Sequence, residues 1–273
     1  MRAGVYLGRA LLVPGLANRP KLMGYVERLA RRHLQRQVAD PALRAKLTPG
    51  YTIGCKRILP SNKWYPAVTQ PNVELVTDGI DHVRPDGIVA RTGDLHQVDT
   101  IVFATGFHVT DVPLSHVATG DGGCTFAEQW DGSPQAYRGT TVAGFPANLF
   151  IRVGPNTGLG HNSTVFMIEA HLAYVIDALE HMRARGATRV AMRPEAQRAH
   201  NERLQARLAR SVWNTGGCSS WYLDRNGNNS TIWPDFTVRF WRRMRRFDPR
   251  AYELTTSPAA ARPRRALRPH RRG

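Results

Sequence analysis

The spacing of apolar and polar positions divides the chain into a helical first segment, a strand-rich middle and a largely helical second half. Up to Thr48, apolar residues recur at the three- and four-residue spacing of amphipathic helices. These recurring positions are Tyr25, Leu29, His33, Leu34 and Val38. From Tyr51 to Gln97 the pattern changes to short strands and turns. A helical start followed by a sheet is therefore predicted.

Four runs in the middle of the chain have the character of strands. Asn72–Val76 alternates between polar and apolar residues, and Gly87–Ala90 follows the turn residues Pro85 and Asp86. Residues 99–107 and 148–153 are continuous apolar runs rich in Ile, Val and Phe, which is typical of strands covered on both faces. We therefore expect a layered α/β domain.

A long helix is predicted directly after residues 154–163. Asn162 or Ser163 suits its N-cap, and Gly186 suits its end behind two arginines. Its apolar residues fall on one face, at Val165, Ile168, Leu172, Val175, Ile176 and Leu179. Beyond Pro194 we expect one more helix, an aromatic-rich stretch over residues 213–247 and a disordered basic tail over 251–273.

Two glycine-containing turns are candidate ligand sites. Thr105 offers a hydroxyl at the end of its strand, and Gly106 lets backbone approach a flat or phosphorylated ligand because it has no Cβ. The loop 154–163 lies between a strand and a helix N-terminus, where free N–H groups and the helix dipole favour an anion or a carbonyl. An ordinary turn and an ordinary strand-to-helix connection are the alternatives. Ser163 replaces the third glycine of a dinucleotide loop, so a primary dinucleotide site is not predicted.

Two further features carry candidate chemistry. Lys56 and Arg57 follow Gly54, and Arg57 cannot lose its proton, so it can stabilise an anionic intermediate in a dry cleft. A plain surface pair of cations is the alternative. His161, at the predicted helix start, is either a ligand contact or a hydrogen-bonded structural histidine.

The formal net charge of +17 raises the possibility of nucleic-acid binding. Six arginines of the C-terminal tail account for part of it, and without them the charge is +11. Most of the remaining excess fits solvated helix faces. A basic nucleic-acid-binding protein, using the tail and the aromatic-arginine stretch from Trp233 to Arg246, is therefore a less favoured hypothesis.

The cysteines Cys55, Cys124 and Cys218 are widely spaced, so neither a metal site nor a disulfide framework is predicted, and a reducing cytoplasm fits. The apolar segment 10–17 behind Arg9 is interrupted by Pro14 and Gly15, which disfavours a signal peptide. No apolar stretch approaches the roughly 20 residues that span a bilayer, so no membrane association is expected.

Read together, five motifs resemble the C-terminal half of Baeyer–Villiger flavin monooxygenases. They are Gly54-Cys-Lys-Arg-Ile-Leu, Ser61-Asn-Lys-Trp-Tyr-Pro-Ala, Pro71-Asn-Val-Glu-Leu-Val-Thr, Asp99-Thr-Ile-Val-Phe-Ala-Thr-Gly-Phe and Gly154-Pro-Asn-Thr-Gly-Leu-Gly-His-Asn-Ser. Their order and spacing agree with the family, over roughly residues 20 to 250. The implied fold class is α/β, a partial flavoprotein with two Rossmann-like dinucleotide-binding halves and a helical N-terminal segment.

The resemblance implies an enzyme that uses NADPH to reduce FAD, captures O2 as a C4a-peroxyflavin and inserts one oxygen atom beside the carbonyl of a ketone. It makes Arg57 the catalytic cation and Lys56 an NADPH ligand. The other implied cofactor-binding residues are Thr105, Gly106, Phe107, Asn156, Gly158, Gly160, His161, Asn162 and Ser163. No metal is implied, and sulfide or amine oxidation stays open.

The glycine loops that begin the FAD and NADPH domains of this family are absent from the sequence. The resemblance thus implies a remnant of the helical insertion at 1–50, the end of the NADPH domain at 51–98 and the end of the FAD domain at 99–250. We expect a C-terminal fragment with little activity alone. A separately encoded N-terminal half is a further possibility, and such a partner would supply both loops.

Overall fold

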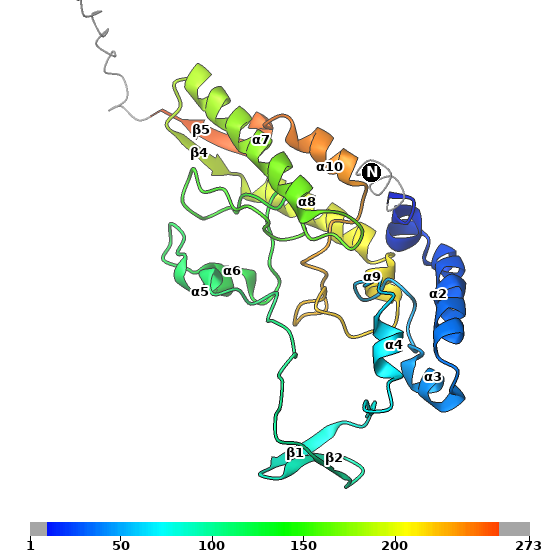
Figure 1. The fold of residues 1–273 in the computed structure, drawn as a ribbon. Helices are drawn as coiled ribbons and strands as arrows, with labels where there is room; N and C mark the ends of the chain where they lie inside the picture. Colours follow the sequence, from blue (N-terminus) through cyan, green and yellow to red (C-terminus); the bar gives the residue numbers. More distant parts are fainter. Residues whose placement is uncertain (1–9, 257–273) are drawn as a thin grey trace, which may run out of the picture.

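The computed structural model describes residues 10–256, which form a main body of helices and loops with a small protruding sheet (Figure 1). Its helices are η1 (Pro14–Asn18), η2 (Pro20–Leu22), α2 (Met23–Gln37), α3 (Pro41–Leu47), α4 (Trp64–Val68), α5 (Leu114–Val117), α6 (Phe126–Trp130), α7 (Thr164–Ala184), α8 (Pro194–Leu208), α9 (Val212–Thr215), α10 (Thr237–Met244) and η3 (Pro249–Ala251). Its strands are β1 (Ile80–Arg84), β2 (Gly87–Ala90), β3 (Leu95–Gln97), β4 (Arg189–Met192) and β5 (Tyr252–Thr255).

The helical start predicted from the apolar spacing is confirmed by α2 and α3. Asp40 caps α3, because its carboxylate accepts hydrogen bonds from the backbone N–H groups of Ala42 and Leu43. Leu34 of α2 is buried, whereas Tyr25 and Leu29 are exposed. Only part of the apolar face of α2 is therefore covered within residues 10–256.

The predicted strand Gly87–Ala90 and the turn before it are confirmed. Strands β1, β2 and β3 form an antiparallel sheet that protrudes from the body at the lower end of Figure 1. Glycine is required at position 87, since a Cβ there would collide with the carbonyl oxygen of His96. The alternating run Asn72–Val76 does not form a strand, because it has no pairing partner in the described chain.

The prediction that residues 99–107 form a buried strand is wrong for this chain. The segment has no strand partner, and it runs as an extended connection between the protruding sheet and the body (Figure 1). The exposed fractions of Val102, Phe103 and Phe107 are 83%, 81% and 94%. A central strand needs hydrogen-bonding neighbours on both sides, and residues 10–256 supply none here.

The predicted strand 148–153 is likewise not formed. Asn148 and Val153 have positive φ values of 69° and 56°, which interrupt an extended backbone. The N–H of Ile151 instead donates to the carbonyl oxygen of Thr140 at 2.6 Å. The segment is consequently a loop that leads into residues 154–163.

The long helix α7 ends where the sequence predicts, with Ser163 before its first residue and Gly186 at a φ of 63° beyond its last turn. Its apolar face, however, is mostly exposed: the exposed fractions of Val165, Leu172, Ile176 and Leu179 are 61%, 40%, 57% and 53%. The opposite face packs against α10 and the core through Met167, Ala170, His171, Tyr174, Ala178 and Met182. Most of the predicted apolar face of α7 is therefore not packed against any part of residues 10–256.

The main core gathers side chains from distant parts of the chain, including η1, α7, α8, α9 and α10. The aromatic-rich stretch contributes Trp213, Tyr222, Trp233, Phe240 and Phe247, all of them buried. Aromatic rings of this size contribute much of the buried apolar area of a core. These five aromatic residues are thus structural, whereas Trp221 and Trp241 of the same stretch are exposed.

The tail predicted from residue 251 begins too early. Ala251 ends η3, and β5 pairs antiparallel with β4, with Tyr252 opposite Met192 and Leu254 opposite Val190. The buried Tyr252 anchors this strand, since its hydroxyl contacts that of Thr141 at 2.9 Å. The tail arginines lie outside the described residues. Within residues 10–256, no helix is long and apolar enough to cross a bilayer.

Candidate functional site

Arg57 lies against the glycine-containing loop 154–163, although the sequence predicts the two as separate candidate sites. The Nη1 of Arg57 donates to the carbonyl oxygen of Leu159 at 3.0 Å, across 102 residues of chain. Both Arg57 and Lys56 are exposed, and the Nζ of Lys56 lies 5.2 Å from the centre of the Tyr51 ring. Neither cation has a carboxylate partner within the described residues, so both charges are available to a ligand.

The turn before these cations requires glycine. Gly54 is buried with a φ of 95°, and a Cβ there would lie 2.5 Å from the Cδ2 atom of Leu16. Its close packing against η1 fixes the start of the segment that carries Lys56 and Arg57.

The first half of the loop 154–163 is bound to the chain around residue 230. The backbone N–H of Asn156 donates to Ser230 at 2.8 Å, and its side-chain Nδ2 donates to the carbonyl oxygen of Asn229 at 2.6 Å. The N–H of Gly158 donates to the carbonyl oxygen of Thr231 at 2.8 Å. These two residues hold the loop in place rather than presenting free donors to a ligand.

We expect Gly158→Ala to destabilise the protein by about 1–3 kcal/mol, the usual cost of overpacking. An added Cβ would lie 2.8 Å from the carbonyl oxygen of Thr231, so the loop would have to move away. Urea unfolding followed by circular dichroism measures the change. Gly24→Ala in α2 is the matched control, because a Cβ at Gly24 meets nothing within 4 Å. Equal stability of the two variants would contradict the packing described here.

The second half of the loop leads into α7. A Cβ on Gly160 would lie 3.0 Å from the Nε1 of Trp213. The Nδ2 of Asn162 donates to the hydroxyl of Thr237 at 3.0 Å, and its Oδ1 accepts the N–H of Ser163 at 2.8 Å. Ser163 precedes the first residue of α7 and makes no side-chain cap. The start of α7 is thus fixed by Asn162 and not by Ser163.

His161 is buried, with an exposed fraction of 3%, and neither of its ring nitrogens has a hydrogen-bond partner within the described residues. Burial lowers the pKa of His161 to about 4, and the nearby Asp235 opposes this shift. His161 is therefore a neutral imidazole at the start of α7. It is not the hydrogen-bonded structural histidine that the sequence leaves as an alternative.

His161 should make the protein less stable in mild acid. The unfolded chain binds a proton near pH 6.5 and the folded one only near pH 4, so the free energy of unfolding falls as pH drops through this interval. The loss is about 3 kcal/mol. His161→Leu should reduce the slope of the unfolding midpoint against pH, while His200, whose pKa burial also lowers to about 4, keeps part of it. His82→Leu, at a side chain that is 56% exposed, is the matched control. An unaltered curve in the first variant would refute the assignment.

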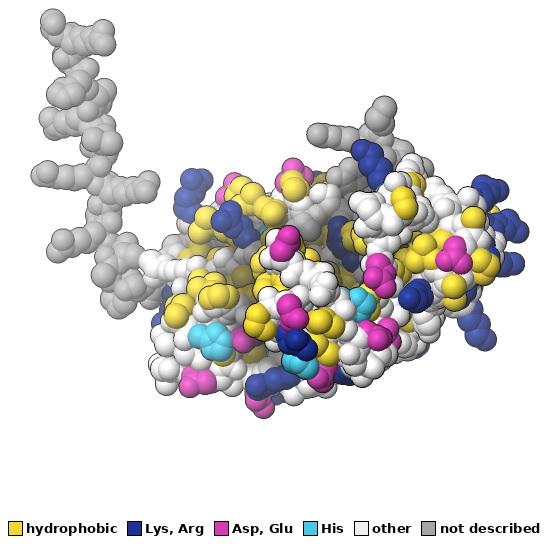
Figure 2. Space-filling view, turned by 60° about the horizontal axis from the view of Figure 1, so that its bottom comes forward, with side chains coloured by type: hydrophobic (Ala, Val, Ile, Leu, Met, Phe, Trp, Pro, Cys, Tyr) yellow, Lys and Arg dark blue, Asp and Glu magenta, His cyan; other side chains and the backbone are white. Residues whose placement is uncertain are grey.

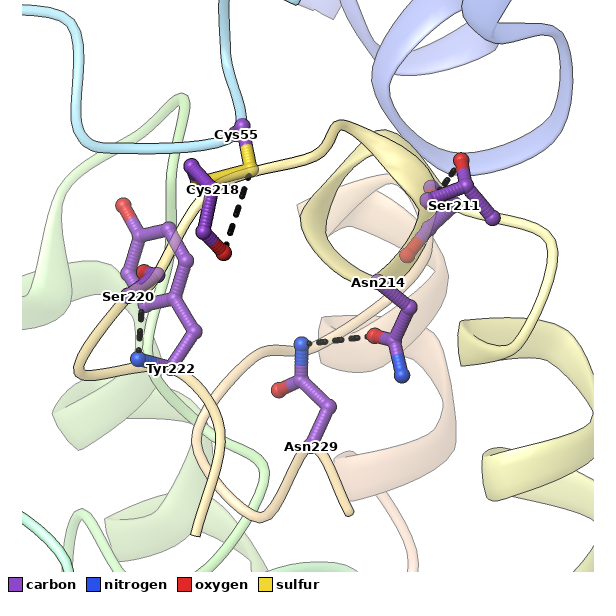
Figure 3. Close-up of a disulfide and its surroundings, with 8 residues drawn as sticks. Cys55, Ser211, Asn214, Cys218, Ser220, Tyr222 and Asn229 are labelled. Carbon is purple, nitrogen blue, oxygen red and sulfur yellow. Dashed lines mark hydrogen bonds between the residues drawn. A yellow bond between two sulfur atoms is a disulfide. The ribbon is translucent and has the colours of Figure 1, made fainter. Parts of the chain in front are cut away.

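Cys55, next to Lys56, forms a disulfide with Cys218 across 163 residues of chain (Figure 3). The sequence-based prediction that the cysteines form no disulfide is therefore wrong for this pair, while Cys124 is free and exposed. The N–H of Thr52 also donates to the carbonyl oxygen of Gly216 at 2.9 Å. Both links join the segment of Arg57 to the chain after α9.

Sequence reasoning missed this pair and also Tyr222, a fully buried residue of the same region (Figure 3). Burial raises the pKa of Tyr222, and the charge of Arg57 opposes the rise, which places the two groups near one another. The spacing of Cys55, Cys218 and Tyr222 along the chain contains no motif. Their proximity depends on the tertiary fold alone.

Thr105, Gly106 and Phe107 lie away from this site, on the exposed connection described above. Within residues 10–256, no hydrogen bond or ion pair involves any of the three. Gly106 has a φ of 92°, which glycine adopts without strain, and a Cβ there would meet nothing within 4 Å. The structure thus brings Arg57 and the loop together and leaves the Ala-Thr-Gly turn apart.

An exposed cation pair, a glycine-containing loop and a helix N-terminus lie at one place, an arrangement that can hold an anionic group. No protein-family model matches the chain. Curated relatives do: it is 49% identical over 261 residues to a Baeyer–Villiger monooxygenase of Pseudomonas aeruginosa, covering 95% of this chain and 49% of that protein. It is 48% identical over 262 residues to a Baeyer–Villiger monooxygenase of Streptomyces coelicolor, covering 95% of this chain and 50% of the relative.

A solved structure agrees with these relatives. The fold matches an oxidised steroid monooxygenase bound to NADP with a TM-score of 0.77 and 28% identity, over 94% of this chain and 51% of the other. The chain therefore matches the C-terminal half of a Baeyer–Villiger-type flavin-containing monooxygenase, and its fold class is that of a partial Rossmann-like flavoprotein. It spans about half the length of the curated relatives that it matches.

Proposed function

We propose that this chain supplies the Arg57 half of the active site of an FAD- and NADPH-dependent monooxygenase that inserts one oxygen atom of O2 beside a ketone carbonyl. The observation that supports it best is the Nη1 contact of Arg57 with Leu159, which holds a permanent cation against the loop at the start of α7. FAD, when bound, would supply the activation of O2. Arg57 would stabilise negative charge that develops beside it.

The residues present fit one side of a flavin site. The N-terminus of α7 provides the positive end of a helix of 21 residues, which favours an anionic ring system. His161 lies just before it with two unpartnered ring nitrogens, but both are buried, so a heterocycle edge would contact them only after the loop moves. Asn156 and Gly158 would support this surface from behind, because their hydrogen bonds fix the loop.

The fit to NADPH rests on Lys56. Its ammonium lies over the ring of Tyr51 and faces no carboxylate within the described residues, so it is free to pair with a phosphate. Thr105, Gly106 and Phe107 would complete the cofactor site only after another part of the protein covers their segment. The domain division at residues 50, 98 and 250 belongs to this same proposal.

We further propose that this chain has little activity alone. Figure 2 shows many apolar side chains on the face that carries the protruding sheet, and the apolar face of α7 is also uncovered. Exposed apolar surface of this extent marks an interface. A polypeptide with the two glycine loops, in the same protein or separately encoded, would cover it and bind the rest of both cofactors.

Complementation tests the proposal. The N-terminal half of the Pseudomonas aeruginosa relative would be joined to this chain or co-expressed with it, since the identity of 49% favours correct packing. We expect bound flavin near one per chain and ketone-dependent NADPH oxidation, both absent from the 273-residue chain alone. Flavin and turnover in the lone chain would overturn the claim of inactivity. A flavin-loaded complex with no turnover on any ketone, sulfide or amine would overturn the function.

Nucleic-acid binding through the aromatic-arginine stretch is not favoured, because Trp233 and Phe240 are buried and cannot stack on bases. A cytoplasmic location is part of this proposal, although the Cys55–Cys218 disulfide favours a compartment that is not strongly reducing.

A further inference from the structure

A second cavity, separate from Arg57 and the loop, lies between α8, α10 and the turn at Arg138. Its volume is about 270 Å³. Its polar lining comprises Arg138, Arg203, Arg243, His200 and Asp248, and its apolar lining Tyr137, Trp233, Phe240 and Met244. Three arginines against one aspartate leave an excess of positive charge in a partly enclosed space.

Asp248 offsets only one of the three arginine charges, because its carboxylate pairs with Arg138. Its Oδ2 accepts the hydroxyl of Tyr137 at 3.0 Å and the Nη2 of Arg138 at 3.3 Å. Arg138 is itself held in place, since its Nη1 donates to the carbonyl oxygen of Arg243 at 2.6 Å. One carboxylate and one guanidinium therefore form the fixed wall of the cavity.

Arg203 and Arg243 are the two cations without a carboxylate. Within residues 10–256, the guanidinium of neither makes a hydrogen bond or an ion pair, and that of Arg243 lies 5.6 Å from the centre of the Trp233 ring. Burial lowers the pKa of Arg243, and Arg207, Arg138 and Arg239 act in the same direction, while Asp235 opposes them. A bound anion would relieve this repulsion.

The backbone at the cavity is also specialised. Arg138 has a φ of 52°, a region that costs free energy for a residue with a side chain and that is common at ligand sites. Its N–H donates to the Nε2 of His200 at 3.2 Å, so the neutral His200 carries its proton on Nδ1. Burial lowers the pKa of His200 to about 4, with Arg138, Arg203 and Arg243 adding to the shift. His200 is thus a neutral donor beside the arginines.

We propose that this cavity is a binding site for a phosphate dianion, either free or as the phosphate group of a small metabolite, held chiefly by Arg203 and Arg243. Guanidinium groups match the geometry of phosphate oxygens, and the rings of Trp233 and Tyr137 provide a flat apolar wall. Sites that enclose whole drug-sized ligands are usually about 300–1,000 Å³, so this cavity suits a phosphate group and not a dinucleotide.

Calorimetric titration of the 273-residue chain with inorganic phosphate tests the proposal, at constant ionic strength and a mildly alkaline pH. We expect saturable binding that weakens about tenfold in Arg243→Gln and in Arg203→Gln, since each removes one charge-assisted contact. Arg198→Gln on α8 and Arg242→Gln on α10 remove the same charge from the same helices outside the cavity. These two controls should bind phosphate as the parent chain does.

Two results would overturn the site: no saturable binding, or equal weakening in the control variants, which would indicate general attraction to a basic surface. Adenosine monophosphate and adenosine distinguish the source of the phosphate. Binding of adenosine monophosphate that is at least tenfold tighter than phosphate, and lost in Arg243→Gln, supports a phosphorylated metabolite with a flat ring. Equal affinity for adenosine monophosphate and inorganic phosphate supports free phosphate. Neither result depends on flavin or turnover, so failure here leaves the proposed oxygenation untouched.

Discussion

Replacing Arg57 with alanine should reduce turnover of the complemented enzyme by roughly 10²–10³-fold, the usual effect of removing one preorganised group that stabilises developing charge. The side chain is exposed and its one hydrogen bond is to the carbonyl oxygen of Leu159, so its loss should hardly change folding. Steady-state NADPH oxidation with a ketone substrate, at matched flavin content, measures the effect. Unchanged unfolding by urea in the variant would confirm that only chemistry is affected.

Two companion variants separate the roles of the neighbouring cations. Arg57→Lys keeps the charge but loses the forked geometry, so it should recover only a small part of the rate. Lys56→Ala should raise KM for NADPH several-fold and leave kcat nearly unchanged, because it would remove binding that is equal in the ground and transition states. If Arg57→Ala retained the parental kcat, Arg57 would be a surface cation and the proposed site would be wrong.

For the helix α7, the sequence predicts the limits of the helix but not which face is buried. Capping signals and spacing give its limits, because they depend on residues next to one another in the sequence. The face that meets this chain's own core cannot be deduced in the same way. Ala170, His171 and Tyr174 face inward although Ile176 and Leu179 are more apolar, which is expected if the apolar face packs against a part of the protein outside residues 10–256.

The run at 99–107 also shows that an apolar pattern alone does not determine the local structure. Its composition is that of a central strand, and the resemblance built on it is confirmed by the relatives. Its conformation depends on hydrogen-bonding neighbours that the described chain does not contain, so it remains an exposed connection with Phe107 almost fully accessible. The sequence of this run identifies the family. Its strand conformation, however, requires neighbouring strands, which the composition of the run does not reveal.

The sequence predicts only some features of the loop 154–163. Its glycines indicate close backbone approach, which Gly158 confirms against Thr231. The burial of His161 without partners depends on tertiary packing, and the contact of Arg57 with Leu159 joins residues 102 positions apart, so no local pattern predicts either.

Loss of the Cys55–Cys218 disulfide should produce the largest change in stability. The bond closes a loop across 163 residues of chain. Restricting the unfolded chain over that distance corresponds to about 5 kcal/mol by chain entropy, and measured disulfides usually contribute about 2–4 kcal/mol. Cys55→Ser with Cys218→Ser should therefore lower the urea midpoint strongly, and dithiothreitol should lower that of the parent chain to a similar value.

Cys124→Ser is the matched control, because Cys124 is exposed and unpaired within the described residues. It should unfold at the parental midpoint and still respond to reductant. In the complemented enzyme, the double variant should also turn over more slowly, since the bond fixes the segment that carries Arg57 beside the loop. A parent chain with three free thiols by mass spectrometry, or one that is insensitive to reductant, would show that the two cysteines are neighbours without a bond. The position of Arg57 would then depend on Gly54 and the Thr52–Gly216 hydrogen bond alone.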